Sequence, residues 1–235
     1  PAYINRPAQG EPATRRQGVP AQLAAGVPME QWRKVWAAHL GLVNLADHWI
    51  GRVLQSVDSV GPNRSTVTAF MSDHGDHLGQ HGMYQKMEMY EEAVRVPMIW
   101  HVPDGASKAI DTPVSHLDVV PTLMDFVGIT KPDGLDGRSL HATIAGGDRL
   151  DSRPVFCQYS GNPTIGDIRH AVITERYKYI YDPDDVPELY DLVNDPQEMN
   201  NVANERKHID ITQALHAECI AWAEAHADWI PWRPT

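Results

Sequence analysis

The chain has 235 residues, of which 42% are hydrophobic and 22% charged, and its formal net charge is −11. This length and composition are ordinary for a globular protein with a sizeable core, built as one large domain or two small ones. The acidic balance argues against a general nucleic-acid-binding surface, so we expect no such partner. The two cysteines, Cys157 and Cys219, argue against a disulfide scaffold and exclude a cysteine-rich zinc site. We expect both to be ordinary buried thiols.

Apolar residues form no run of about 18, so the sequence predicts no membrane-spanning helix and no membrane partner. No basic start followed by an apolar stretch indicates a signal peptide. The first residue is Pro1 rather than Met, which we interpret as a processed end or the end of a fragment. The cellular location stays open, with the bacterial cytoplasm and the periplasm as the expected alternatives.

The first half of the chain predicts alternating helices and strands. Residues 1–28 are rich in Pro, Gly, Gln and Ala, which indicates irregular chain. From Met29 to about Leu54, apolar residues recur at three- and four-residue spacing, which predicts a helix. Residues 61–63 (Gly-Pro-Asn) break the chain, and residues 66–71 then have the composition of a buried strand.

A second strand is expected at residues 96–102, followed by a helix that Ser115 caps. Asp118 lies three residues after Ser115, which is a capping-box pattern with Asp in place of the usual Glu. The order helix, strand, polar loop, strand and helix predicts an α/β domain. We expect a mixed, mainly parallel sheet with flanking helices over residues 1–150.

The pattern changes after about residue 150. Residues 154–159, 170–181 and 188–192 predict short strands, with a hairpin inside the second of these ranges. A final helix is expected from about residue 205 to residue 227. Residues 151–235 therefore predict a small antiparallel α+β subdomain.

The densest polar cluster, at residues 73–82, directly follows the first predicted strand. In α/β sheets, ligands bind beyond the carboxyl ends of strands. The carboxylate of Asp73 and the imidazole of His74 would ligate one divalent metal there. Lys86 would return its ammonium group to the same site and neutralise an oxyanion. From residue types alone, a solvated loop and an exposed lysine are the alternatives.

Other residues near this cluster have competing interpretations. His77 and His81 have the four-residue spacing of a zinc-protease helix, but no Glu lies between them and Gly79 disfavours a helix. Gly75 would let the backbone approach a ligand closely. Arg95 would contact an anion or form a structural ion pair, and we favour the ion pair.

Residues 71–86, with the sequence MSDHGDHLGQHGMYQK, begin a series of landmarks that occur in order along the chain. The other landmarks are residues 87–99, 115–123, 133–140, 176–179 and 188–196. Together these segments resemble the sulfatase family of the alkaline phosphatase superfamily. The resemblance covers residues 30–225, and a series of this length is hard to obtain by chance.

The resemblance implies an alkaline phosphatase-like α/β fold and the hydrolysis of sulfate esters. It implies a formylglycine nucleophile and one divalent metal, calcium first, with magnesium or manganese as alternatives. Asp73 and His74 match the later pair of metal ligands in the family. Lys86 matches the lysine that binds the sulfate group or the leaving oxygen, a role that is both catalytic and substrate-binding. The expected substrate is a small sulfate ester or a sulfated saccharide.

The chain lacks the C-x-P-x-R-type motif from which the formylglycine is made, and it lacks the earlier acidic metal ligands. The resemblance therefore implies a C-terminal part only, which needs the N-terminal remainder as a partner and is inactive alone. A homo-oligomer stays open. A phosphate- or phosphonate-ester hydrolase of the same superfamily is the first alternative, because the Asp73-His74 pair also fits it. A non-catalytic interaction domain is the second.

Overall fold

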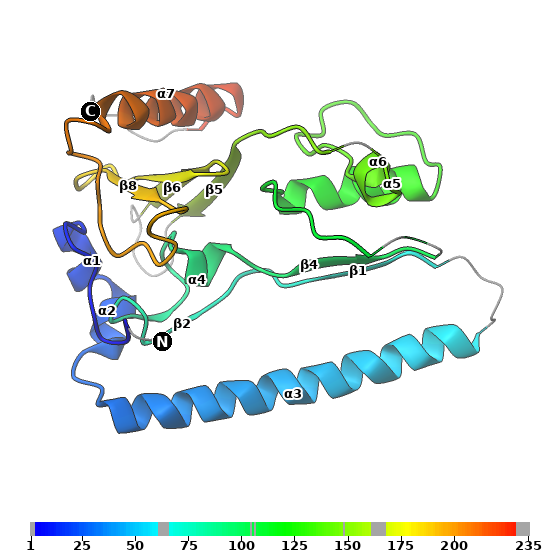
Figure 1. The fold of residues 1–235 in the computed structure, drawn as a ribbon, viewed down its shortest axis with the longest axis horizontal. Helices are drawn as coiled ribbons and strands as arrows, with labels where there is room; N and C mark the ends of the chain where they lie inside the picture. Colours follow the sequence, from blue (N-terminus) through cyan, green and yellow to red (C-terminus); the bar gives the residue numbers. More distant parts are fainter. Residues whose placement is uncertain are drawn as a thin grey trace.

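The computed structural model describes residues 3–60, 66–103, 105, 107–147, 149–160 and 168–228, and the predicted break at 61–63 lies outside them (Figure 1). Within these ranges, none of the helices combines the length and hydrophobicity that crossing a membrane requires. The helical elements are α1 (Ala13–Gln17), α2 (Val19–Ala24), α3 (Met29–Ser59), α4 (Glu91–Val94), the 3₁₀ turn η1 (His116–Asp118), α5 (Val119–Phe126), α6 (His141–Ile144) and α7 (Ile209–Ala225). The strands are β1 (Thr68–Met71), β2 (His77–Leu78), β3 (Tyr84–Gln85), β4 (Met98–His101), β5 (Val155–Ser160), β6 (Ile168–Ile173), β7 (Tyr177–Tyr181) and β8 (Glu188–Asp191).

The prediction of a mainly parallel sheet is wrong for the residues that the structure describes. β1 pairs with β4, β2 with β3, and β5 to β8 with one another in sequence order, and every one of these pairs is antiparallel. A parallel pair needs a crossover, usually a helix, that returns the chain to the other end of the sheet. Between β1 and β4 the chain forms only β2, β3 and the single turn α4. It therefore enters β4 beside the C-terminal end of β1 and runs back along it. Met71 therefore lies opposite Met98.

The sheet β5–β8 is covered on both faces, and Figure 1 shows α7 lying along one of them. On that side, Leu215 and Cys219 of α7 join a core cluster with strand residues. On the other side, Met83, Met89 and Tyr90 join a second cluster with strand residues. Because both faces are covered, β6, β7 and β8 are buried along nearly their whole length instead of alternating. The predicted hairpin is present as β6 and β7, while the domain boundary near residue 150 stays a prediction.

The N-terminal segment is more ordered than its composition predicts, since it forms α1 and α2. Arg15 of α1 is 1% exposed and contacts three carboxylates, at 3.2 Å from Glu88, 2.9 Å from Asp182 and 2.6 Å from Glu188. Arg169 of β6 lies 3.3 Å from Glu88 and 3.5 Å from Asp182. Buried charges persist only where they are paired. This ion cluster therefore fixes the N-terminal segment to the ends of β7 and β8.

Helix α3 begins at the predicted residue and runs beyond its predicted end. Trp32 in its second turn is 2% exposed, and its indole N–H donates to Asn5 Oδ1 at 2.7 Å. Figure 1 shows the rest of the helix extending past the N-terminal segment, below β1 and β4. Its large apolar side chains are exposed there, and they include Leu40, Leu42, Val43, Leu45, Trp49 and Val53. Over most of the length of α3, none of the described residues therefore buries the apolar stripe from which the helix was predicted.

Arg15→Leu is expected to lower the free energy of unfolding by about 3–5 kcal/mol. Three carboxylates stay buried, Glu188 loses its guanidinium, and Glu88 and Asp182 keep that of Arg169. Urea denaturation followed by circular dichroism measures the change. The control is Arg149→Leu, because Arg149 is 81% exposed and pairs with Glu175 at 3.2 Å. Its loss is expected to stay below about 1 kcal/mol. Equal losses at the two positions would contradict a structural role for the buried cluster.

Candidate functional site

The loop that follows β1 carries Asp73 and His74 at the end of the strand, where the sequence placed them. Ser72 Oγ donates to the His74 carbonyl at 2.8 Å, and the His74 backbone N–H donates to Asp73 Oδ1 at 2.9 Å. The second bond holds the Asp73 carboxylate against its own backbone, although its side chain is 83% exposed. This hydrogen bond, with the nearby His74 and Lys86, lowers the pKa of Asp73, so the carboxylate is ionised at neutral pH.

The ring of His74 directs Nδ1 to a backbone carbonyl and Nε2 to Asp73 and Lys86. Its Nδ1 lies 2.9 Å from the Gly75 carbonyl, and a carbonyl only accepts, so Nδ1 carries the proton. The lone pair is then on Nε2, which lies 3.4 Å from Asp73 Oδ2 and 2.6 Å from Lys86 Nζ. The structure thus brings the three predicted site residues together. An imidazole oriented by a backbone carbonyl, beside an ionised carboxylate, is a donor pair that fits a divalent cation.

Lys86 reaches this point because the backbone turns immediately before it. Gln85, the last residue of β3, has a φ of +77°, a left-handed conformation that is uncommon for a residue with a side chain. Met87 and Met89, which follow, are buried in the core. The ammonium group of Lys86 is therefore held at His74 by a chain segment that is anchored on both sides.

Gly75 has a different role from the one predicted for it. Its N–H donates to the Ala93 carbonyl at 2.8 Å, and a Cβ at this position would lie 2.0 Å from the Glu92 carbonyl oxygen. The close approach that requires glycine is therefore made to the backbone of α4 and not to a ligand. Helix α4 supports the loop that carries Asp73 and His74.

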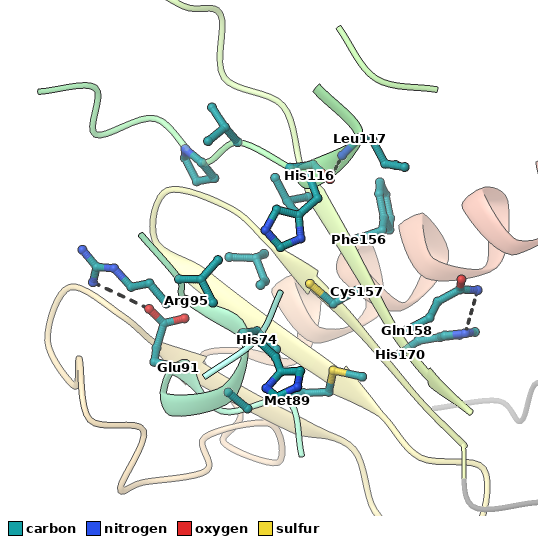
Figure 2. Close-up of a pocket in the computed structure, with 18 of the residues that line it drawn as sticks. His74, Met89, Glu91, Arg95, His116, Leu117, Phe156, Cys157, Gln158 and His170 are labelled. Carbon is teal, nitrogen blue, oxygen red and sulfur yellow. Dashed lines mark hydrogen bonds and ion pairs between the residues drawn. The ribbon is translucent and has the colours of Figure 1, made fainter. Parts of the chain in front are cut away.

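Asp73, His74 and Lys86 line a pocket with a volume of about 1280 Å³, which is shown in part in Figure 2. Its other walls come from the start of β4, from η1, from β5 and β6, and from the end of α7. Arg95 lies 3.6 Å from Glu91 and is 80% exposed, in agreement with the predicted ion pair. Cys157 also lines the pocket, and burial raises the pKa of its thiol, so it is protonated at neutral pH.

Sequence reasoning missed the polar residues that the C-terminal sheet contributes to this pocket. Gln158 Nε2 donates to Asp228 Oδ2 at 2.6 Å, and His170 Nε2 lies 3.2 Å from the same oxygen. Burial lowers the pKa of His170, with Asp228 opposing the shift, so the ring is neutral at pH 7. The three residues come from β5, β6 and the chain after α7, and no local spacing relates them.

His77 and His81 do not form a zinc-protease pair. His77 belongs to β2, and His81 lies in the following turn with a φ of +53°, so no helix carries them. Both rings are buried, and their centroids are 5.9 Å apart. Sequence reasoning also missed Glu92 and Glu198, which the fold places near His81.

Two family models match the chain. The one described as Sulfatase covers residues 3–129, and the one described as N-sulphoglucosamine sulphohydrolase, C-terminal, covers residues 79–225. Among curated relatives, a sulfatase of Formosa agariphila is 31% identical over 188 residues, which are 80% of this chain and 36% of that protein. A choline-sulfatase of Rhizobium meliloti is 32% identical over 188 residues, which are 78% of this chain and 36% of that protein.

Solved structures agree with the family models. A 2-O GAG sulfatase has a TM-score of 0.81 and 28% identity, over 88% of this chain and 47% of its own. A protein in complex with its substrate D-glucosamine-2-N,6-O-disulfate has a TM-score of 0.67 and 28% identity, over 77% of this chain and 39% of its own. The phosphonate monoester hydrolase of Agrobacterium radiobacter has a TM-score of 0.74 and 26% identity, over 85% and 43%.

This chain spans less than half the length of each of these proteins, with shares of 36% to 47%. Each family model covers more than half of the chain. The chain therefore belongs to the sulfatase family of the alkaline phosphatase superfamily and corresponds to a C-terminal portion of its full-length members.

Proposed function

We propose that the full-length protein hydrolyses sulfate esters and that this chain supplies part of the catalytic centre. The observation that carries the proposal is the convergence of Asp73, His74 and Lys86 in one pocket. Asp73 and His74 act as two ligands of a divalent metal, with calcium as the first expectation. Lys86 binds the sulfate group or the leaving oxygen.

A bound divalent cation would supply Lewis-acid stabilisation of the sulfate oxygens. Residues of this chain orient the ligand atoms that would bind the cation. The Gly75 carbonyl accepts a hydrogen bond from His74 Nδ1, so Nε2 is the ring nitrogen that would ligate a metal once Lys86 Nζ, now 2.6 Å from it, turns to the substrate anion. The His74 backbone N–H orients the Asp73 carboxylate. Lys86 Nζ donates to an anionic oxygen and stabilises the charge that develops during sulfate transfer.

The nucleophile is expected as a formylglycine outside this chain, because no C-x-P-x-R-type motif occurs in the printed sequence. Cys157, the cysteine that lines the pocket, lies in Phe-Cys-Gln-Tyr, which does not match that motif. The chain alone is therefore expected to be inactive.

The preferred substrate class is a sulfated saccharide. One similar solved protein is in complex with its substrate D-glucosamine-2-N,6-O-disulfate, and another is a 2-O GAG sulfatase. A pocket of about 1280 Å³ exceeds the roughly 300–1,000 Å³ of ordinary small-ligand sites. Gln158, His170 and Asp228 offer hydrogen-bonding groups to sugar hydroxyls at its far wall.

Hydrolysis of phosphate or phosphonate monoesters is the second candidate. It is favoured by the structural similarity to a phosphonate monoester hydrolase, with a TM-score of 0.74. The Asp73 and His74 donor pair suits either anion, so the residue type of the nucleophile decides between them.

The exposed face of α3 is proposed to pack against the remainder of the full-length protein. At about 100° per residue, Leu42, Val43, Trp49 and Val53 fall on the same side of the helix as the buried Trp32. One apolar stripe is therefore covered at its first turns and exposed beyond them. The similar proteins are more than twice as long as their matched regions, with shares of 36% to 47%, so enough chain exists to cover it.

Leu42→Glu is expected to leave the unfolding free energy of the isolated chain within about 0.5 kcal/mol, since Leu42 is 66% exposed. In the full-length protein the same change is expected to cost about 2–5 kcal/mol, because it buries a carboxylate in an apolar contact. Denaturant unfolding of both proteins measures the difference. The control is Gln55→Glu, on the opposite side of α3. Equal costs for Leu42→Glu in both proteins would exclude this contact.

Lys86→Met in the full-length protein is expected to lower kcat/KM for an aryl sulfate by about 10²- to 10³-fold, because the charge on the transferring group loses its cation. Lys207→Met is the control, since Lys207 is 73% exposed and pairs with Glu205. The same assay with a phosphate monoester tests the second candidate. If Lys86→Met stays as active as Lys207→Met, the assigned role of Lys86 is wrong.

A further inference from the structure

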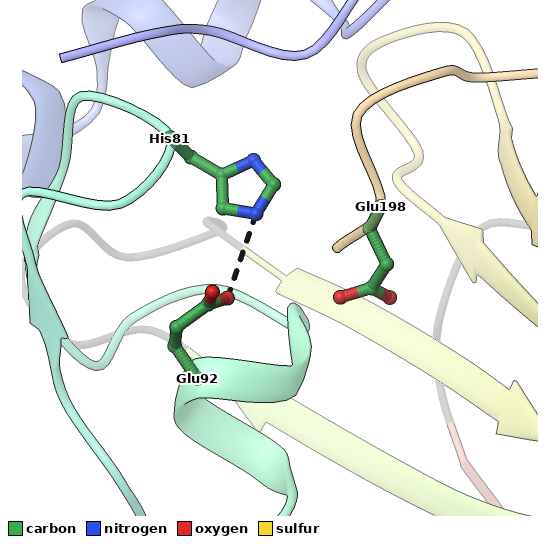
Figure 3. A group of neighbouring side chains, drawn as sticks. All are labelled: His81, Glu92 and Glu198. Atoms are coloured by element: carbon green, nitrogen blue, oxygen red, sulfur yellow. Dashed lines mark ion pairs between the residues drawn. The ribbon is translucent and has the colours of Figure 1, made fainter. Parts of the chain in front are cut away.

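A second group of metal-ligating side chains lies away from Asp73 and His74, on the other side of α4. Figure 3 shows His81 from the turn after β2, Glu92 from α4 and Glu198 from the loop after β8. One ligand atom from each of the three residues lies within 4.8 Å of the other two. His81 Nε2 is 3.5 Å from Glu92 Oε2. His81 and Glu198 are fully buried, and the side chain of Glu92 is 10% exposed.

This group coincides with a concentration of unsatisfied buried atoms. Among the described residues, His81 Nδ1 has no hydrogen-bond partner, and His81 Nε2 has only the 3.5 Å ion-pair contact with Glu92. Neither ring nitrogen of His77, whose ring contacts that of His81, has a hydrogen-bond partner there. Oε2 of Glu92 also lacks a hydrogen bond. Buried polar atoms in folded proteins are hydrogen-bonded in the great majority of cases, and an exception often marks the place of an ion or water. Several such atoms around one point indicate a ligand there.

The charges around this point favour a cation. Glu91, Glu92 and Glu198 supply three carboxylates, against one buried ammonium on Lys178. Three carboxylates against one ammonium leave a formal excess of two negative charges, although burial raises the pKa of Glu198 to about 7 and so keeps part of it protonated at neutral pH. A dication would balance this excess and displace the Glu198 proton. Lys178 lies 2.7 Å from Glu91 and 2.8 Å from Glu198. It therefore keeps the ion pair with Glu91 if Glu198 binds a metal instead.

Three other groups face the cluster. The Glu91 backbone N–H donates to Glu198 Oε2 at 2.6 Å, so Glu198 Oε1, which Lys178 contacts, is the oxygen available to a metal. The Tyr3 hydroxyl donates to Glu92 Oε1 at 2.7 Å, which leaves Oε2 available. Arg16 donates to the His81 carbonyl at 2.9 Å, and its charge is balanced by Glu11 at 2.5 Å.

We propose that His81, Glu92 and Glu198 bind a second metal ion, a transition-metal dication such as Zn²⁺ or Mn²⁺. One imidazole and two carboxylates suit these ions better than Ca²⁺, which prefers oxygen ligands alone. The ion ties together the turn after β2, α4 and the loop after β8. Because α4 supports Gly75 through its backbone, the ion is structural and steadies the loop of the candidate catalytic site.

The test uses Zn²⁺ as the probe and removes the candidate catalytic ligands first, with Asp73→Asn and His74→Ala. The chelator-treated protein is titrated with Zn²⁺ by isothermal calorimetry, and the metal content is measured after dialysis. We expect one equivalent per chain in this background and a rise in melting temperature on binding. Adding His81→Gln, or separately Glu198→Gln, is expected to weaken binding at least tenfold.

His216→Gln is the matched control, because His216 is also a buried histidine but contacts Tyr179 at 2.9 Å. Circular dichroism establishes which variants fold. X-ray absorption of the zinc-loaded background gives a second readout that needs no variant at the site, with nitrogen and oxygen ligands and at least one imidazole expected. A folded background that binds no Zn²⁺, binding that His81→Gln and Glu198→Gln leave unchanged, or sulfur in the ligand shell would overturn the proposal.

Discussion

The placement of the candidate site depends on a buried ion cluster that contacts none of the proposed ligands. Arg15 holds Glu88 and Glu188 in the protein interior. Burial opposes its charge, but the carboxylates outweigh this effect and raise the pKa of Arg15 above its ordinary value. Glu88 lies two residues after Lys86, so the cluster fixes the segment from which Lys86 reaches His74. A polar interaction in the core thus determines where a cation lies in the pocket.

Helix α4 links the two sites that we propose, although it is only one turn long. Its backbone carbonyls meet Gly75 so closely that no side chain fits there. Its Glu92 side chain points the other way, to His81 and Tyr3. The exposed carboxylate of Asp73 and the buried one of Glu92 therefore belong to neighbouring segments but have opposite surroundings. A metal bound at Asp73 would be open to solvent and could exchange a ligand with it. A metal bound at Glu92 would be enclosed by protein, as in a structural site.

Features with a local cause could be predicted from the sequence, and features set by tertiary contacts could not. The capping box at Ser115 and Asp118 is present, because both bonds form within four residues. The mainly parallel sheet was predicted incorrectly, since a short apolar run suits a buried strand of either orientation. The family resemblance indicated Asp73, His74 and Lys86, which lie within fourteen residues. Residues such as Asp228 and Glu198 reach their sites from distant segments, and no spacing connects them to the motif.

The exposed surfaces and the metal site that we propose lead to the same inference about the rest of the protein. Two proposed ligands from one loop, Asp73 and His74, would make a weak site, so we expect further ligands from outside this chain. Strand β1 ends at that loop, and β1 and β4 form only a two-stranded ribbon within the described residues, which is marginal without further packing. Helix α3 runs below the same ribbon (Figure 1), and its apolar side chains are exposed over most of its length. A segment that packs between them would both cover these side chains and bring new side chains to the end of β1. Covering the apolar surface and completing the site are then one event, so the chain should gain stability and a full set of metal ligands together.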